Sequence, residues 1–318
     1  MAVRHGFIDR LSGLHDDDCT PGGKRAENEV MMVDKTLRGL ISANVPIRAV
    51  GVHDGLSAIM AENAGFEALW AGGLGISTSH GVPDAGILTM TEFLQDAVRI
   101  RRASSLPVIA DVDAGFGDVN VVRRMAGLYE AEGIDAVCIE DKQYPKRNSF
   151  LDGHLLEEPL AFARKIEAAK AAQRGESFMV IARLESLIAG AGMEDALSRA
   201  VLYAKAGADA ILVHSKERQP SEIAEFCARA GDAGLELPLF AVPTTYHVTT
   251  VEGLHAMGIT GMIYANQLIR GSVTAMEEVL TSLARTSSTT EMESQIAPVK
   301  RLFDLVGTET LDNAGIPA

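Results

Sequence analysis

Charged residues end a series of short apolar runs in this sequence, and their types suggest chemistry on an anionic ligand. Four are carboxylates: Asp84, Asp111, Asp113 and Glu140. If the runs are parallel strands of one sheet, these acids meet at one edge and repel one another unless a cation lies between them. Hard oxygen ligands that leave room for water suit Mg²⁺. Alternatively, each acid caps the helix that follows its strand. Capping could explain a single acid, but it explains four acids at successive strand ends less well.

Cations end or follow the same runs and indicate an anion-binding site: Lys142, Lys146, Arg183 and His214. The planar guanidinium of Arg183 can donate two parallel hydrogen bonds to a phosphoryl group. The alternative for this arginine is an ion pair with Glu185 or Glu140. Both interpretations place it at the same end of the sheet.

Two backbone segments accompany these side chains. The turn Gly72-Gly73-Leu74 offers N–H groups to a carboxylate, and the single tryptophan, Trp70, either lines the site or packs in the core. Residues 142–155 (KQYPKRNSFLDGHL) form a long charged loop that contains proline and glycine. Loops of this length between regular elements are typical of active-site lids, although a solvated excursion is the alternative.

Eight short apolar runs must position these residues: 47–52, 68–71, 107–113, 136–141, 178–183, 210–215, 238–243 and 261–266. Each is too short for a helix and too uniformly apolar for a strand with one exposed face. Amphipathic stretches lie between them, among them 120–132, 160–173, 193–206 and 221–230. Eight strands alternating with helices predict an α/β protein with a single (β/α)8 TIM-type barrel. An open doubly wound sheet is the alternative, but the dinucleotide motif Gly-x-Gly-x-x-Gly does not follow the first run.

Four similar junctions support one barrel over two domains: AENAGFEALWA, EAEGIDAVCIE, AKAGADAILVH and HAMGITGMIYA. In each, a glycine (65, 133, 207 or 258) stands where a helix should end in a left-handed residue, with a strand expected two residues later. We therefore expect a polar arm over 1–27, the barrel over 28–285 with an extra helix over 28–43, and a linker with a C-terminal helical segment over 286–318.

The composition narrows the possible partners. The 318 residues carry 29 Lys and Arg against 43 Asp and Glu, a formal net charge of −14. So acidic a chain has no basic surface for nucleic acid, and no apolar stretch is long enough for a membrane span. Three widely spaced cysteines indicate neither a disulfide framework nor a zinc site. A small-molecule substrate and a cytoplasmic location are expected.

Several motifs resemble those of phosphoenolpyruvate mutases, within the isocitrate lyase superfamily. Residues 140–149 match the pattern Glu-Asp-Lys-x5-Asn-Ser. Further matches are Asp-x-Asp-x-Gly-Phe-Gly at 111–117, Ile-Ala-Arg at 181–183, His-Ser-Lys at 214–216, Val-Pro-Thr at 242–244 and Ala-Asn at 265–266. The similarity extends from about residue 47 to 285.

The resemblance implies roles for individual residues. Asp111 would bind Mg²⁺ directly, with Asp84, Asp113 and Glu140 holding metal-bound waters. The implied substrate-binding residues are Trp70, Gly72, Gly73, Leu74, Asn148, Arg183 and His214. The implied catalytic residues are Asp84, Lys146, Asn148, Ser149, Arg183 and His214. The loop would gate the site, and C-terminal helices would be exchanged in a homo-oligomer, a dimer or tetramer.

The implied reaction interconverts phosphoenolpyruvate and phosphonopyruvate, a C–P bond-forming step of phosphonate biosynthesis. The mutase branch usually has Ser at the position of Gly72, Thr at Ala114 and Asn at Asp118. These differences predict a less tightly packed mouth of the active site, with one hydroxyl group fewer beside the site for the substrate carboxylate. Residues 82–85 resemble phosphonopyruvate hydrolase, which is the first alternative, although that enzyme typically has Thr at the position of Asn148. A C–C lyase of a 2-hydroxy or 2-oxo dicarboxylate is the second alternative, but the loop lacks the cysteine of the isocitrate lyase branch.

Overall fold

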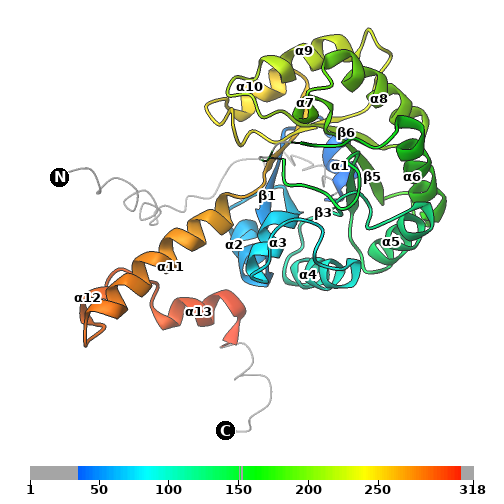
Figure 1. Cartoon of the computed structure of the whole chain (residues 1–318). Coiled ribbons are helices and arrows are strands. Elements are labelled where there is room, and N and C mark those ends of the chain that lie inside the picture. Colours follow the sequence, from blue (N-terminus) through cyan, green and yellow to red (C-terminus); the bar gives the residue numbers. More distant parts are fainter. Residues whose placement is uncertain (1–34, 150, 152, 309–318) are drawn as a thin grey trace, which may run out of the picture. The chain divides into compact units, whose positions relative to one another are not determined.

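The chain forms a closed barrel of eight parallel strands in sequential order, as the sequence predicts (Figure 1). The computed structural model describes residues 35–149, 151 and 153–308. The strands are β1 (Ile47–Val52), β2 (Ala68–Ala71), β3 (Val108–Asp111), β4 (Ala136–Glu140), β5 (Met179–Leu184), β6 (Ala210–Val213), β7 (Leu239–Ala241) and β8 (Ile259–Tyr264). Pairing of β1 with β8 closes the barrel, so the alternative of an open sheet is wrong.

Helices surround the strands in Figure 1. They are α1 (Leu37–Ser42), α2 (Gly55–Asn63), α3 (Gly73–Ser79), α4 (Met90–Ala103), α5 (Val119–Ala131), α6 (Pro159–Ala172), α7 (Ser186–Ala189), α8 (Met193–Lys205), α9 (Ser221–Ala230) and α10 (Val251–Ala256). After β8 come α11 (Gln267–Arg285), α12 (Thr290–Glu293) and α13 (Val299–Val306). No helix in the described part of the chain has the length and hydropathy needed to cross a membrane.

Both faces of the strands are buried, which explains their uniformly apolar sequences. Alternate residues of β1 illustrate this: Ile47 and Ala49 belong to a cluster inside the barrel, whereas Val50 and Val52 pack with the surrounding helices. The interior is tightly filled, because a Cβ atom on Gly261 would lie 2.1 Å from the ring of Phe240. The strands therefore form a rigid base for the loops at their carboxyl ends.

The four repeated glycines all take the left-handed conformation, with φ of 77° at Gly65, 78° at Gly133, 98° at Gly207 and 106° at Gly258. The predicted helix ends are thus confirmed. The predicted spacing to the strand is wrong: β2, β4 and β6 begin three residues after their glycine, and β8 begins at the next residue.

Some predicted boundaries also differ. The run at 261–266 forms a strand that starts and ends two residues earlier, because its pairing with β1 stops at Tyr264. The described part of the predicted helix over 28–43 is α1, and the predicted arm over 1–27 lies outside the described residues. The predicted linker over 286–318 contains the short helix α12 before α13, and residues 309–318 also lie outside the described part.

Candidate active site

A pocket lies where the strands lead into the following loops. It is lined by Trp70, Gly72, Gly73, Leu74, Asp84, Asp111, Glu140, Lys142, Lys146, Arg147, Asn148, Ser149, Arg183, His214, Val242, Thr244, Ala265 and Asn266. Every residue predicted for the site lines this pocket except Asp113, which is fully buried beside it. Parallel strands bring these residues together because all their carboxyl ends open on one face of the barrel.

The four predicted carboxylates come from three segments of this face. Asp111 ends β3 and Glu140 ends β4, while Asp84 lies between α3 and α4. Asp113 follows β3 in a left-handed conformation, with φ of 49°. The helices that follow these segments are capped by other residues: Thr89, Asp118 and Glu158. The capping alternative is therefore wrong for these four acids.

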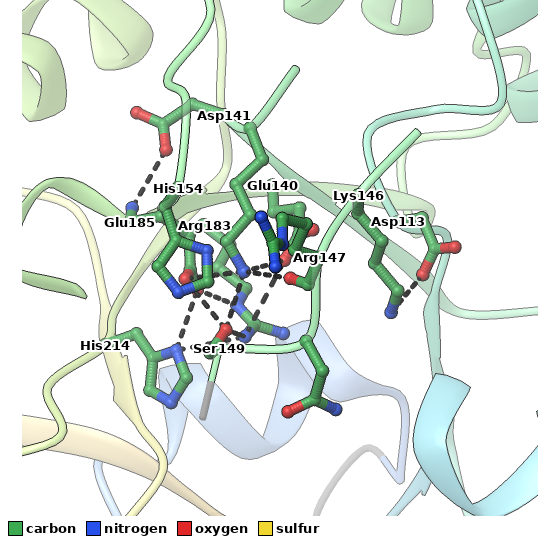
Figure 2. A network of polar contacts seen from close by, with 12 residues as sticks. Asp113, Glu140, Asp141, Lys146, Arg147, Ser149, His154, Arg183, Glu185 and His214 are labelled. Atoms are coloured by element: carbon green, nitrogen blue, oxygen red, sulfur yellow. Dashed lines mark hydrogen bonds and ion pairs between the residues drawn. The ribbon is translucent and has the colours of Figure 1, made fainter. Parts of the chain in front are cut away.

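Lys146 inserts its ammonium group between two of the carboxylates, and Figure 2 shows its contact with one of them, Asp113. Its Nζ atom lies 2.8 Å from Oδ1 of Asp84 and 2.5 Å from Oδ1 of Asp113. Burial opposes protonation of Lys146, but Asp113, Asp111 and Asp84 outweigh it and raise the pKa of the lysine well above its ordinary value. The loop thus supplies one positive charge to the acidic cluster.

The cluster fits a further cation. Asp113 Oδ2 and Glu140 Oε1 are buried and have no hydrogen-bond partner among the described residues. Burial, together with the charges of Asp111 and Glu140 and against that of Lys146, raises the pKa of Asp113 to about 7. A divalent ion near these oxygens would relieve both the desolvation and the repulsion.

The geometry restricts how such an ion could be held. In the described part of the chain, no group of three or more His, Cys, Asp or Glu side chains converges closely enough to coordinate a metal directly. Mg²⁺ often keeps several waters and uses only one or two protein carboxylates, so the donor set fits this ion through a mixture of direct and water-mediated contacts.

Arg183 and His214 lie side by side in the lining of the pocket (Figure 2). Arg183 lies in β5 and His214 directly follows β6; Nη2 of the arginine is 3.0 Å from Nδ1 of the histidine. Arg183 also makes the alternative ion pairs, with Nε at 2.6 Å from Glu185 and Nη2 at 3.7 Å from Glu140. Burial lowers the pKa of His214, against the opposing charge of Glu185. These ion pairs therefore fix the orientation of the Arg183 side chain, which still lines the pocket.

The first part of the loop over 142–155, residues 142–149, contributes five residues to the pocket lining. Its two ends are joined by backbone hydrogen bonds from Gln143 to Leu155 and from Glu157 to Asp141, both 2.8 Å long. Farther along, the amide of Asn148 donates to Asp84 Oδ2 at 2.9 Å. Lys146 and Ser149 are buried, which does not agree with a solvated excursion. The position of the loop is that expected of a lid.

Gly72 and Trp70 fit together at the mouth of the pocket. Gly72 precedes α3, and a Cβ atom at this position would lie 2.6 Å from Nε1 and 2.7 Å from Cδ1 of Trp70. The indole belongs to the interior cluster and also lines the pocket. The mouth is not loosened at this position as the sequence suggested, because the indole edge fills the space.

The other two departures lie away from the pocket. Ala114 is buried and its carbonyl accepts a hydrogen bond from Lys165, while Asp118 accepts from the backbone N–H groups of Asn120 and Val121 and caps α5. Neither residue is among the described residues that line the pocket.

Sequence reasoning missed some residues of the site. Thr244 lines the pocket, and its buried hydroxyl has no hydrogen-bond partner among the described residues. The Val-Pro-Thr motif at 242–244 could have identified it. Glu185 was considered only as a partner of Arg183, although it contacts several residues of the site.

Comparisons with known proteins agree with this arrangement. Residues 37–284 match the sequence profile described as phosphoenolpyruvate phosphomutase. A phosphoenolpyruvate phosphomutase from Streptomyces hygroscopicus is 43% identical over 283 residues, covering 87% of this chain and 88% of the relative.

Solved structures show the same similarity. The crystal structure of phosphoenolpyruvate phosphomutase from Streptomyces platensis subsp. rosaceus is 44% identical, with a TM-score of 0.85 over 87% of this chain and 96% of that chain. A phosphonopyruvate hydrolase in complex with oxalate and Mg²⁺ is 37% identical, with a TM-score of 0.81 over 87% and 95% of the two chains. The family resemblance, and the barrel predicted from the apolar runs, are thereby confirmed. The chain belongs to the phosphoenolpyruvate phosphomutase family.

Proposed function

We propose that this protein is a Mg²⁺-dependent phosphoenolpyruvate phosphomutase that serves phosphonate biosynthesis. One observation carries the proposal: the pair Arg183 and His214 lines the same pocket as an acidic cluster and a segment of the loop over 142–155. This combination suits a substrate that has a phosphoryl group at one end and a carboxylate at the other. The mutases among its relatives support the same activity.

The reaction moves a PO₃ group within one substrate. The P–O bond to the enol oxygen of phosphoenolpyruvate breaks, and a P–C bond to carbon 3 forms, giving phosphonopyruvate without gain or loss of water. Arg183, His214 and Asn148 hold the PO₃ group, whose transfer passes through a loose transition state. The backbone N–H groups of Gly73 and Leu74 orient the substrate carboxylate.

The protonation state of His214 contributes to this binding. Its Nδ1 atom lies 2.7 Å from Glu185 Oε1, which favours an N–H at that nitrogen. Donation from the second ring nitrogen to the phosphoryl group as well requires the protonated ring. Substrate binding is therefore expected to raise the pKa of His214.

Asp111, Asp113, Glu140 and Asp84 would hold Mg²⁺, which when bound stabilises negative charge on the enolate and carboxylate oxygens. The structure of a relative with oxalate and Mg²⁺ supports this choice of ion. The loop keeps water from the transferring group, and Lys146, Asn148 and Ser149 fix its position over the pocket.

Phosphonopyruvate hydrolysis, giving pyruvate and phosphate, is the second candidate, because a hydrolase is also similar over most of the chain. It differs only in whether water captures the PO₃ group. A C–C lyase is less well supported, since the described cysteines, Cys138 and Cys227, lie outside the loop and the pocket lining.

We further propose a homo-oligomer in which another copy covers the C-terminal helices. Met276 and Leu280 of α11 are 53% and 64% exposed, and α13 has no buried residue although Leu302 and Phe303 are apolar. Such a surface favours association. The cytoplasmic location expected from the sequence stays a prediction.

Phosphorus NMR of phosphonopyruvate incubated with the protein and Mg²⁺ tests the activity. We expect a phosphoenolpyruvate resonance to appear, whereas inorganic phosphate alone would support the hydrolase. Arg183→Met should abolish the conversion. Arg38→Met is a matched control, because Arg38 forms an ion pair with Asp209 at 2.6 Å outside the pocket lining.

A further inference from the structure

Glu185 follows β5 and lies at a junction of the site, where its side chain contacts four others (Figure 2). Oε1 accepts hydrogen bonds from Arg183 Nε at 2.6 Å and from His214 Nδ1 at 2.7 Å. Oε2 accepts from Ser149 Oγ at 2.9 Å and lies 2.9 Å from Lys142 Nζ. These partners come from two barrel strand ends and from the loop over 142–155.

The charge of Glu185 is held inside the protein. The side chain is 0% exposed, and it is not among the described residues that line the pocket. Burial disfavours ionisation, but Arg183, His214 and Lys142 outweigh it and hold the pKa of Glu185 well below its ordinary value. An anionic substrate therefore meets the cations that Glu185 orients and not the carboxylate itself.

Ser149 is the contact between the loop and this carboxylate. Its hydroxyl donates to Glu185 and accepts from Lys142 Nζ at 2.6 Å and from Arg183 Nη2 at 3.2 Å. A serine hydroxyl has one donor and two acceptor positions, so these three bonds use its full capacity. Ser149 therefore holds the loop against Glu185, Lys142 and Arg183.

The backbone of Glu185 is fixed from behind the site. Its N–H group donates to Asp141 Oδ1 at 2.8 Å, and Oδ2 of Asp141 accepts from Tyr203 of α8 at 3.0 Å. Arg199 of α8 lies 3.3 Å from the same oxygen. Glu185 is thus anchored independently of the loop, so that removing Ser149 changes its side-chain partners but leaves its backbone in place.

We propose that Glu185 is a positioning residue that couples closure of the loop over 142–155 to the alignment of Arg183 and His214. In the closed loop, Ser149 bridges Glu185 and Arg183. When the loop opens, both lose this bridge, and the phosphoryl-binding pair is less firmly held. The inference rests on the proposed function, because it assigns Arg183 and His214 to the phosphoryl group.

Trypsin cleavage after Arg147 measures loop opening without substrate. The arginine is exposed, but the next residues, Asn148 and Ser149, are held by Asp84 and Glu185, and these contacts must break before the protease can bind the segment. We expect Ser149→Ala to speed this cleavage about 10-fold or more, the effect of losing a hydrogen bond to a charged group. Glu185→Gln should give a similar increase, and the double variant should be cleaved little faster than either single one. Ser105→Ala, which removes a serine–glutamate hydrogen bond with Glu62 elsewhere, should match the parent protein.

Two further readouts separate alignment from a general loss of structure. Glu185→Gln should lower the pKa of His214 in NMR titrations, since Arg183 and Lys142 then face the ring without the carboxylate, whereas Ser149→Ala should change it little. Both variants should lower kcat more than they raise KM for phosphonopyruvate.

Parental cleavage rates for Ser149→Ala would overturn the coupling, even if Glu185→Gln did not fold. Fully additive effects in the double variant, or an unchanged His214 pKa in Glu185→Gln, would also overturn it. The cleavage result is independent of activity. A parent protein that fails to convert phosphonopyruvate would refute the proposed function, while the cleavage rates would still decide the coupling.

Discussion

Replacing Gly72 with alanine tests how closely the mouth of the pocket is packed. The added Cβ atom would lie 2.6 Å from Nε1 and 2.7 Å from Cδ1 of Trp70. Both distances are shorter than real Cβ atoms tolerate, so the indole or the backbone of residue 72 must move. The indole has little freedom, because Trp70 is 2% exposed and packs in the interior of the barrel.

The size of the effect follows from this geometry. Overpacking a filled interior costs about 1–3 kcal/mol of the free energy of unfolding. In a domain of this size each kcal/mol lowers Tm by about 2–4 °C. Gly73 and Leu74 follow directly, and a shift of about 1 Å in a substrate-positioning group can lower the rate about 100-fold. We therefore expect kcat/KM to fall about 10- to 100-fold.

Calorimetry and steady-state kinetics on Gly72→Ala provide the assay. Gly127→Ala is the matched control, since Gly127 lies within α5 and a Cβ atom there meets nothing within 4 Å. The control should be more stable than the parent by about 0.5–1 kcal/mol and fully active. A Gly72→Ala variant with parental Tm and kcat/KM would refute the packing argument.

Three other predictions concern the metal, the loop and the histidine. Asp111→Ala should abolish turnover together with Mg²⁺ binding measured by calorimetry; near-normal activity would contradict the assignment. Asn148→Ala should reduce kcat by about 10-fold or more, as expected for loss of a hydrogen bond to a charged group, with unchanged Mg²⁺ affinity, and an unchanged rate would exclude Asn148 from the reaction. Burial lowers the pKa of His214 below its ordinary value of 6.5, so the unfolded chain binds a proton at a higher pH than the folded chain does. The free energy of unfolding therefore falls as the pH drops below about 6.5. His214→Asn should therefore lose less free energy of unfolding between about pH 7.5 and 5.5 in urea titrations, and equal losses would contradict the cause of the shift.

The barrel was predictable because its determinants are local. Buried strands read as short apolar runs, and a glycine marks each of four helix ends with a left-handed residue. The end of β8 was misplaced by two residues because Ala265 and Asn266 continue the apolar run to a polar residue, whereas pairing with β1 ends at Tyr264. Pairing depends on the neighbouring strand and is not visible in one segment.

The site was predictable only in part for a related reason. A charged residue near the end of a strand looks the same in sequence whether it lines the pocket, as Arg183 does, or is buried outside the lining, as Glu185 is. The position of Lys146 between Asp84 and Asp113 depends on the conformation of the loop. The indole beside Gly72 shows likewise that a missing side chain need not leave empty space.

The central claim is that the PO₃ group moves between oxygen and carbon without meeting water. Phosphonopyruvate incubated with the protein and Mg²⁺ in water enriched in oxygen-18 tests it directly, because the isotope shifts the phosphorus resonance of any phosphorus atom to which it is bonded. We predict phosphoenolpyruvate with no oxygen-18 at the three non-bridging oxygens of phosphorus. The bridging oxygen is not diagnostic, because it derives from the C2 carbonyl of phosphonopyruvate, which exchanges with water. Inorganic phosphate that contains one oxygen-18 atom, with no phosphoenolpyruvate formed, would contradict the mutase and identify a hydrolase.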